Sequence, residues 1–393
     1  MALAVAAAAL VGLVLLAHGL LGRHARHSPA AEHPTALRTP GGPASSVPIA
    51  VAPNVIPRPR APTKFSGIAM SAGDGFQLLL GGPAPGLFST ATGRFQPVIG
   101  LPLWRPGYEF TRVAGGWAVQ RYSPPQAICQ ECDAPPPVYF LGDQKTRAVV
   151  VASGYDATAA ATPGDLWLTA YLPDANIGNS AGTVQEVTVT GHAVGRPSLL
   201  PSGYLIDRAV HGGLLLAPYS RGPGLATDEL WNPAMRRVVH EFTNVIAASS
   251  DEIAWNPCTG ACPLKIITLT TGETEIIQLP RGGWADGGTF SADGRLLAVQ
   301  VSADIQQNGY AATTRIEVIA VAGRRLRVLA GTRVSSLVGV SFGWLAGSDR
   351  LVAAIPGPTG VVQLGSWQPG ASHLSLQSVR LPDGASLVLG DSG

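Results

Sequence analysis

Charged and aromatic side chains are scarce in this chain. Of its 393 residues, 13% are charged and 6% are aromatic, whereas 46% are hydrophobic. Such a hydrophobic share supplies enough apolar surface for a large core, so the composition excludes disorder of the whole chain. Gly (48 residues) and Pro (33 residues) are abundant. This balance favours many short elements joined by tight turns and argues against a helical bundle.

A strong charge of either sign is also missing. The formal net charge is +2, but residues 1–63 hold five Arg and one Glu, which leaves a net charge of −2 on residues 64–393. Proteins that bind nucleic acids by charge carry a clear basic excess. We therefore expect no nucleic-acid partner.

Long hydrophobic runs are missing except at residues 1–22, which contain no charged side chain. This run is long enough for a short membrane-spanning helix or for the apolar part of a secretion signal. No cysteine follows it closely and no clear A-x-A cleavage site precedes Arg23. We expect a single N-terminal anchor in the cell membrane with an extracytoplasmic domain; a cleaved, secreted form is the alternative. Arg23 and Arg26 follow the run and favour the opposite orientation, so the orientation stays open.

A proline-rich linker is expected between this run and the folded domain. Residues 23–63 contain nine Pro and show no periodicity, which is typical of an extended, semi-rigid spacer. The folded domain is then expected over residues 64–393.

The rest of the chain is a repeat. Seven times a strand, a tight turn, a strongly apolar strand and two further strands follow one another. The apolar second strands begin near Gly75, Gly116, Gly164, Gly212, Asp251, Gly294 and Asp349. Four antiparallel strands in each unit of roughly 40–50 residues are the signature of a β-propeller blade. The sequence therefore predicts an all-β fold, a β-propeller of seven four-stranded blades preceded by an N-terminal hydrophobic helix.

One repeat resembles a known family. The sequence FSADGRLLAV at residues 290–299 resembles the F-S-x-D-G motif of WD40-like, TolB-type propeller repeats, and residues 340–352 look like a degenerate copy. Asp293 and Gly294 are expected to form the tight turn between the first and second strands. The resemblance implies a bacterial, extracytoplasmic propeller. The WD dipeptide of the eukaryotic subfamily is absent, so its intracellular scaffold roles are not implied.

Ring closure requires one strand from an end of the chain. Residues 47–51 and 386–389 are both candidates, and six or eight blades remain open beside seven.

The four cysteines form two local pairs, Cys129 with Cys132 and Cys258 with Cys262. Both pairs fall between the second and third strands of their repeats, in the second and the fifth repeat. Three blades separate the pairs, which is too far for one tetrahedral zinc site. In an exported domain we expect two local disulfides, with zinc binding and thiol redox chemistry as alternatives.

Residues that carry chemistry are few. The expected innermost strands (SGIAMS, YEFTRV, GGTFSA and GVSFGW) offer little beyond Glu109, and the blades leave no room within residues 65–382 for a hydrolase domain. The paired acids Asp228-Glu229 and Asp251-Glu252 are interpreted as solvated caps. The histidines are interpreted as surface residues, and the tryptophans of the second strands as packing between blades. We expect no catalytic residue, no cofactor and no metal ion.

Tyrosines mark one face of the predicted ring, because the loops between the second and third strands are the long ones. The candidate binding residues in these loops are Tyr122, Tyr171, Tyr219, Gln307, Asn308 and Tyr310. Turn residues on the opposite face, such as Asp143 and Glu273, are expected not to matter for binding. The resulting hypothesis is a non-catalytic propeller that binds a protein or glycan of the cell envelope through its loop-rich face. The alternative is a propeller enzyme of the lactonase, lyase or glycosidase type with a site in the central funnel.

Overall fold

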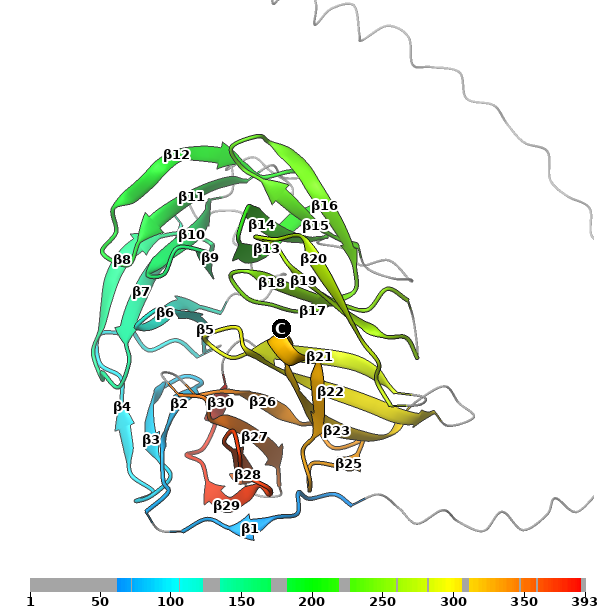
Figure 1. Cartoon of the computed structure of the whole chain (residues 1–393). Coiled ribbons are helices and arrows are strands. Elements are labelled where there is room, and N and C mark those ends of the chain that lie inside the picture. The colour runs from blue at the N-terminus through cyan, green and yellow to red at the C-terminus, as the bar shows by residue number, and fades with distance from the viewer. Residues whose placement is uncertain are drawn as a thin grey trace, which may run out of the picture. The chain divides into compact units, whose positions relative to one another are not determined.

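Seven small β-sheets arranged around a centre make up the described part of the chain (Figure 1). The computed structural model describes residues 62–389 except 72, 106, 123–134, 171–181, 219–226, 259–260, 281–282, 306–310, 346–347 and 358–359. The expected N-terminal helix and residues 23–61 of the expected linker lie outside the described residues. Within these residues, no helix is long and apolar enough to cross a membrane.

Each sheet is one blade, and its strands follow one another outward from the centre. Blade 1 contains β30 (Ser386–Val388), β2 (Gln77–Gly81), β3 (Gly86–Ser89) and β4 (Phe95–Pro97). Blade 2 contains β5 (Tyr108–Val113), β6 (Gly116–Arg121), β7 (Pro137–Gly142) and β8 (Ala148–Ser153). Blade 3 contains β9 (Asp156–Ala159), β10 (Asp165–Ala170), β11 (Thr183–Thr188) and β12 (Ala193–Leu199). Blade 4 contains β13 (Tyr204–Val210), β14 (Gly213–Pro218), β15 (Thr227–Asn232) and β16 (Arg237–Thr243).

The last three blades follow the same plan. Blade 5 contains β17 (Val245–Ala248), β18 (Glu252–Trp255), β19 (Leu264–Thr268) and β20 (Glu273–Ile277). Blade 6 contains β21 (Trp284–Phe290), β22 (Leu296–Ile305), β23 (Ala311–Ala320) and β24 (Arg325–Val328), with β25 (Val334–Ser335) paired to β23. Blade 7 contains β26 (Ser341–Trp344), β27 (Leu351–Pro356), β28 (Val361–Trp367) and β29 (Ser375–Arg380), with β1 (Ile68–Ala69) at its outer edge. The predicted seven-bladed propeller is confirmed, and every apolar run proposed as a second strand is one.

A strand from the carboxyl side closes the ring. β30 pairs antiparallel with β2, with Leu79 opposite Val388, and so becomes the innermost strand of blade 1. Residues 386–389 are therefore the closing segment of the two that the sequence allowed. Residues 47–51 lie outside the described residues.

The segment SGIAMS was expected to be an innermost strand, and this expectation is wrong. Its β1 instead runs parallel to β29 as the fifth, outermost strand of blade 7. Phe65, which precedes it, is buried between blades 6 and 7. The backbone N–H and C=O of Phe65 both bond to the side-chain amide of Gln363. This anchoring holds the segment at the outside of the ring and leaves the innermost place in blade 1 to β30.

Apolar side chains fill the spaces between neighbouring blades. One cluster joins Leu78 and Leu80 of blade 1 to Val352 and Leu364 of blade 7, and all four side chains are buried. Burying a leucine side chain fully contributes roughly 2 kcal/mol. The tryptophans of the second strands lie in or against such clusters, as expected from their positions.

The F-S-x-D-G motif forms the expected tight turn in blade 6. Gly294 has φ of +70°, a conformation that glycine adopts without strain. The Asp293 carboxylate accepts from the Ser291 hydroxyl at 2.7 Å and from the Arg295 N–H at 3.1 Å. The bond from Ser291 is the main reason why the pKa of Asp293 is lowered. The motif thus specifies local turn geometry.

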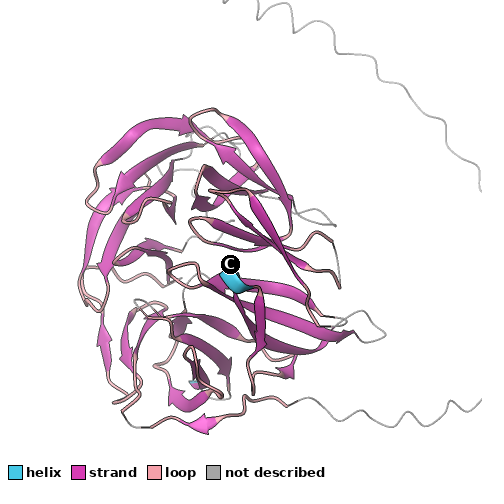
Figure 2. Ribbon diagram, in the orientation of Figure 1, coloured by secondary structure: helices cyan, strands magenta, loops and turns pink. Residues whose placement is uncertain are grey.

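Strands make up almost all of the described ring (Figure 2), and the connections between them lie on its two faces. We call the face with the second-to-third loops and the connections between blades the loop face. The other, with the first-to-second and third-to-fourth turns, is the turn face. The latter includes the short 3-10 helix η2 (Val321–Gly323).

Candidate functional site

Of the predicted binding residues on the loop face, Tyr122 is described. It follows β6 and is 40% exposed. Its N–H donates to the Gly107 carbonyl at 3.1 Å, and its own carbonyl accepts from the Trp104 indole N–H at 3.0 Å. Tyr171, Tyr219, Gln307, Asn308 and Tyr310 lie outside the described residues. Their role in binding stays a prediction.

One cysteine pair lies outside the described residues and the other within them. Cys129 and Cys132 lie outside the described residues, whereas Cys258 and Cys262 lie in the loop between β18 and β19. These two are free thiols, and the Cys262 thiol donates to the Cys258 carbonyl with an S···O distance of 3.2 Å. Burial, with a smaller contribution from Cys258, raises the pKa of Cys262 to about 11. The disulfides stay predictions.

Four carboxylates lie on the innermost strands of the propeller. They are Glu109 on β5, Asp156 on β9, Asp207 on β13 and Asp286 on β21. Strand register sets Glu109 and Asp156 near the loop-face ends of their strands, since Glu109 is opposite Gln120 near the end of β6 and Asp156 is opposite Thr169. Asp207 lies in the middle of β13. We call these four residues the acidic ring. The sequence interpretation recognised Glu109 and missed the three aspartates.

Two members of the acidic ring are placed by β-bulges. The register between β13 and β14 shifts between Ile206 and Arg208, and Asp207 is the extra residue. The register between β21 and β22 shifts in the same way around Asp286. A bulge turns a side chain out of the regular alternation of the strand. Asp286 accepts hydrogen bonds from the Trp284 indole N–H at 2.5 Å and from the Ser302 hydroxyl.

Gln120 of β6 links two members of the ring. Its side-chain N–H₂ donates to Glu109 at 3.0 Å and to Asp156 at 3.3 Å, across the boundary between blades 2 and 3. Gln120 is 5% exposed, and its amide oxygen Oε1 has no hydrogen-bond partner. A buried carbonyl without a donor costs about 1–3 kcal/mol. The protein therefore leaves a hydrogen-bond acceptor unsatisfied inside its acidic ring.

Burial raises the pKa of two of these carboxyls. For Glu109, desolvation is the largest cause; the bond from Gln120 opposes it and the nearby Asp156 adds to it. For Asp156, desolvation is again the largest cause; bonds from Gln120 and from the Ala157 N–H oppose it, and Asp207 adds to it. Raised carboxyl pKa values in a cleft are typical of functional sites, although ion-pair networks can also produce them.

A small cavity of about 150 Å³ adjoins the ring at blades 4 to 6 and is lined by Asp207, Asp228 and Asp286 together with Arg208. Arg208 donates to the Ala248 carbonyl at 2.8 Å. Asp228 is 2% exposed and accepts from the Val245 N–H at 3.2 Å. The interpretation of Asp228 as a solvated cap is therefore wrong, because it is buried on β15, the third strand of blade 4.

Its neighbour Glu229 is also not a solvated cap. It accepts from the Tyr204 hydroxyl at 2.5 Å, and this bond is the main reason why the pKa of Tyr204 is raised to about 12.

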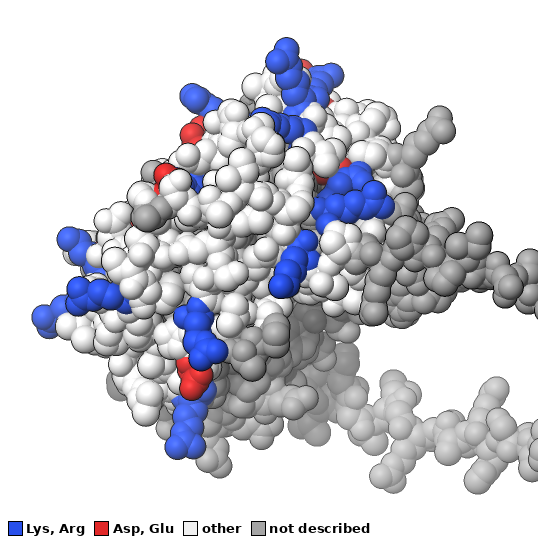
Figure 3. Space-filling model, turned by 90° about the horizontal axis from the view of Figure 1, so that it is seen from below, with Lys and Arg blue, Asp and Glu red and all other residues white. Residues whose placement is uncertain are grey.

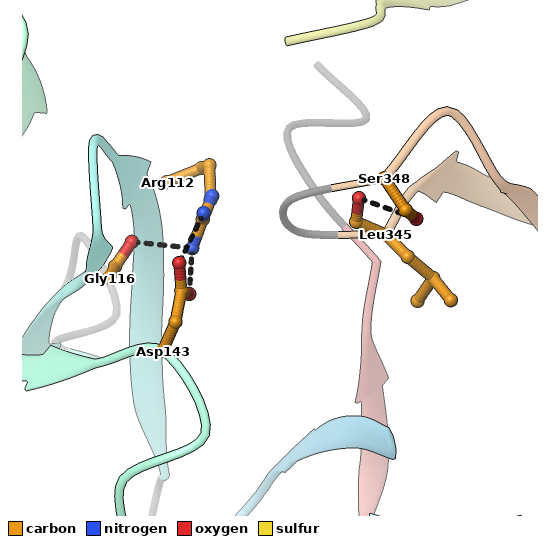
Figure 4. Close-up of polar contacts among 5 residues, drawn as sticks. All are labelled: Arg112, Gly116, Asp143, Leu345 and Ser348. Atoms are coloured by element: carbon orange, nitrogen blue, oxygen red, sulfur yellow. Dashed lines mark hydrogen bonds and ion pairs between the residues drawn. The ribbon is translucent and has the colours of Figure 1, made fainter. Parts of the chain in front are cut away.

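A larger cavity, of about 530 Å³, opens on the turn face between blades 7, 1 and 2. Asp143 lies on its wall and pairs with Arg112 through two hydrogen bonds of 2.5 and 2.9 Å (Figure 4). The same guanidinium donates to the Gly116 carbonyl at 2.9 Å and lies 5.1 Å from the centre of the Trp117 ring. Asp143 is therefore not an isolated turn residue. We call this space the turn-face cavity.

The histidines, possible metal ligands and surface charges add little evidence for a further site. His192, His211, His240 and His373 are exposed, as expected. Across the described ranges, no group of three or more His, Cys, Asp or Glu side chains is arranged to hold a metal ion. On the side of the molecule drawn in Figure 3, basic side chains are spread in small groups over a mostly uncharged surface.

Comparisons with known proteins support the fold. No family model and no curated protein matches the chain. The periplasmic gluconolactonase of Pseudomonas aeruginosa is 14% identical, with a TM-score of 0.50 over 81% of this chain and 100% of its own. A prolyl endopeptidase is 10% identical, with a TM-score of 0.50 over 79% of this chain and 47% of its own, so our chain spans about half its length. The β-propeller domain of the trilobed protease of Pyrococcus furiosus is 10% identical, with a TM-score of 0.43 over 70% of this chain and 82% of its own. At these identities the likeness to the gluconolactonase and the prolyl endopeptidase shows the fold alone.

Proposed function

We propose that the protein is a non-catalytic, extracytoplasmic propeller of the TolB-like type that binds a protein partner of the cell envelope at its loop face. In this proposal the acidic ring receives a lysine or arginine side chain of the partner. The N-terminal apolar run would hold the protein at the cell membrane. Of the two kinds of partner considered, a glycan without cationic groups is less suited to a ring of carboxylates.

The arrangement around Gln120 carries this proposal. Glu109 and Asp156 share one amide N–H₂ group, Asp207 lies close enough to raise the pKa of Asp156, and the Gln120 carbonyl oxygen has no donor. An ammonium or guanidinium group supplies what is missing, since it brings positive charge and several N–H donors. Among the described residues that line the adjoining cavity, Arg208 is cationic and Asp207, Asp228 and Asp286 are acidic.

Peptide binding to the full chain tests the proposal. A lysine-rich peptide and its fully acetylated counterpart are compared by isothermal titration calorimetry at low and high salt. We expect the lysine form to bind at least about tenfold more tightly, a difference of about 1.4 kcal/mol, and to weaken as salt screens the carboxylates. Binding should strengthen from pH 4 to pH 7, because the raised pKa values of Glu109 and Asp156 delay their ionisation.

Variants locate the effect. The triple variant Glu109→Gln, Asp156→Asn, Asp207→Asn removes charge with little change of shape and should abolish the preference for the lysine peptide. Glu241→Gln, on the exposed outermost strand β16, is the matched control. Equal binding of both peptides, or a triple variant that binds as the wild type does, would overturn the proposal.

A propeller enzyme is the second candidate, and one observation favours it. Two carboxyl groups with raised pKa values are bridged by a single amide, and such a pair could divide the roles of acid and base. Because one structural neighbour is a gluconolactonase, a gluconolactone is the first substrate to test. Hydrolysis that Asp156→Asn abolishes would favour this candidate over binding alone.

A further inference from the structure

Two stretches of the sequence are basic and contain no acidic residue. Residues 318–348 hold four arginines, and residues 33–73 hold four basic residues. Outside these stretches, the rest of residues 64–393 has 17 basic and 24 acidic residues, a net charge of −7. The two stretches are therefore opposite in sign to the remainder of the propeller.

Backbone hydrogen bonds bring the two stretches side by side. The Ser335 N–H donates to the Pro62 carbonyl at 2.8 Å, and the Ser66 N–H donates to the Gly331 carbonyl at 2.9 Å. The chain at residues 62–66 thus runs antiparallel to residues 331–335. β24 and β25 follow one another along the outer side of β23, so the chain enters the ring at the outer edge of blade 6 (Figure 1).

Five basic side chains are exposed at this edge. They are Lys64, Arg324, Arg325, Arg327 and Arg333, and we call them the basic edge.

The fold leaves much of this charge uncompensated. Arg327 donates to the Ala371 carbonyl at 2.5 Å and lies 5.6 Å from the centre of the Trp367 ring, so both of these partners are uncharged. Among the described residues, no ion pair to Lys64, Arg325 or Arg327 occurs. Arg324 differs, because its guanidinium lies 3.2 Å from the Glu275 carboxylate. At least three positive charges of the basic edge are therefore available to an anionic partner.

Exposed apolar side chains lie beside these charges. Val328 at the end of β24 is 49% exposed, Leu337 just after β25 is 85% exposed, and Ile68 of β1 is 60% exposed. Apolar side chains next to basic ones suit the surface of a lipid bilayer, because the apolar groups enter among the headgroups and the cations meet the anionic lipids. The edge has both kinds of group.

The chain that precedes Pro62 points to the same partner. It has 61 residues, and the first 22 are the apolar run that is expected to lie in the membrane. A tether of this kind holds a domain near the bilayer at an effective concentration of about millimolar, so a weak affinity is enough for docking. Because the tether joins the ring at the basic edge, this edge can reach the bilayer without the chain passing around the ring.

We propose that the basic edge docks on the surface of a membrane that contains anionic lipids. The outer edges of blades 6 and 7 then face the bilayer, and both faces of the ring stay accessible. The inference rests on the membrane anchor of the proposed function, but it does not use the acidic ring.

Photocrosslinking of the full chain in lipid nanodiscs tests the inference. The photoreactive amino acid benzoylphenylalanine replaces Leu337 in one sample and, as the control, Leu199 in another; Leu199 is 48% exposed on β12 of blade 3. The discs contain phosphatidylcholine alone or together with phosphatidylglycerol, and mass spectrometry identifies the adducts. At position 337 we expect lipid adducts in the anionic discs and at least about fivefold fewer in the neutral discs or at high salt. Position 199 should give none above background.

Charge variants separate docking from insertion of the N-terminal run. Lys64→Gln combined with Arg325→Gln removes two charges that have no described partner, so the fold should be unaffected. We expect this variant to enter the discs as the wild type does and to form at least about fivefold fewer lipid adducts at position 337. Arg196→Gln combined with Arg237→Gln, on the exposed outermost strands of blades 3 and 4, is the matched control and should change nothing.

The outcomes also separate this inference from the proposed function. A chain that enters the anionic discs without lipid adducts at position 337 overturns the inference while the anchor stands. Adducts between two copies of the chain at this position overturn it in favour of self-association, and a chain that enters neither kind of disc overturns it together with the anchor. A chain that forms the lipid adducts but shows no preference for the lysine peptide supports the inference and contradicts the role of the acidic ring.

Discussion

The loop-face end and the turn-face end of the propeller differ in how their charged side chains are paired. Toward the loop face, Glu109 and Asp156 keep part of their surface exposed, partial burial raises their pKa values, and the Gln120 amide that bridges them has a carbonyl oxygen without a donor. At the turn face, Asp143 has a guanidinium partner with two short bonds. Charges that the fold pairs internally stabilise it, whereas charges that it leaves partly unsatisfied cost stability and are available to a ligand. One scaffold therefore carries a structural end and an acidic end.

The largest expected effect concerns the closing strand at the turn-face end. Leu389 is 6% exposed and packs in the cluster that joins blades 7 and 1. Leu389→Ala should reduce the free energy of unfolding by about 3 kcal/mol, because it removes buried methyl groups and leaves a cavity. Urea unfolding of the full chain measures this. Leu337→Ala, at a side chain that is 85% exposed, should leave the midpoint unchanged; an equal loss in both variants would contradict the packing.

Breaking the ion pair tests the structural end directly. Asp143→Ala should lower the free energy of unfolding by about 2 kcal/mol, since it removes two hydrogen bonds to a charged group. Asp349→Ala, in an exposed turn of blade 7, is the control and should have little effect. If Asp143→Ala proves as stable as the wild type, the pair is not structural and the contrast between the two ends fails.

Neutralising Asp156 of the acidic ring should have the opposite effect and increase the free energy of unfolding. The fold raises the pKa of Asp156, so the stability tied to its protonated form is complete below the ordinary aspartate pKa and is lost as pH rises through the raised value. Asp156→Asn, uncharged at every pH, should therefore stabilise the protein at pH 7 by about 1 kcal/mol. The gain should vanish near pH 3, as measured by urea unfolding at both values. A destabilised variant at pH 7 would mean that the charge is satisfied in the free protein.

The smallest effect concerns the cysteine pair on the loop face. Cys258 and Cys262 are free thiols in the structure, and the disulfide between them is a prediction. Such a bridge would close a very short loop, so its formation should raise the free energy of unfolding by only about 1 kcal/mol. Once reduced, Cys262 should react slowly with iodoacetamide at pH 7 and faster as pH approaches its pKa of about 11. Mass spectrometry follows both the non-reduced pairing and the labelling. Rapid labelling of Cys262 at pH 7 would show that its thiol is not held as described.

The seven blades of the propeller can be predicted from the sequence, whereas most residues of the acidic ring cannot. The reasons are physical. The second strand of a blade has a neighbouring strand on each side and is buried, so its sequence is a continuous apolar run, such as GLLLAP in β14. An innermost strand has a partner strand along one edge only. It can therefore be short and mix polar with apolar residues, as DATA in β9 does. The bulges at Asp207 and Asp286 further break the alternation that marks a half-buried strand. The sequence did contain one indication of the acidic ring. In four repeats, an acidic residue lies at a similar position in the first strand, shortly after the connection from the previous blade.

Ring closure by β30 also determines when blade 1 can be completed during synthesis. During synthesis β2 is made near the beginning of the ring and its partner β30 only after all the other blades, so blade 1 remains a three-stranded sheet with an open inner edge until then. An open strand edge is a template for pairing with other chains. We therefore expect the nascent chain to depend on protection, by chaperones or by slow release from the ribosome, until its last strand emerges. The same seam offers a place to circularly permute the protein so that blade 1 is made without interruption.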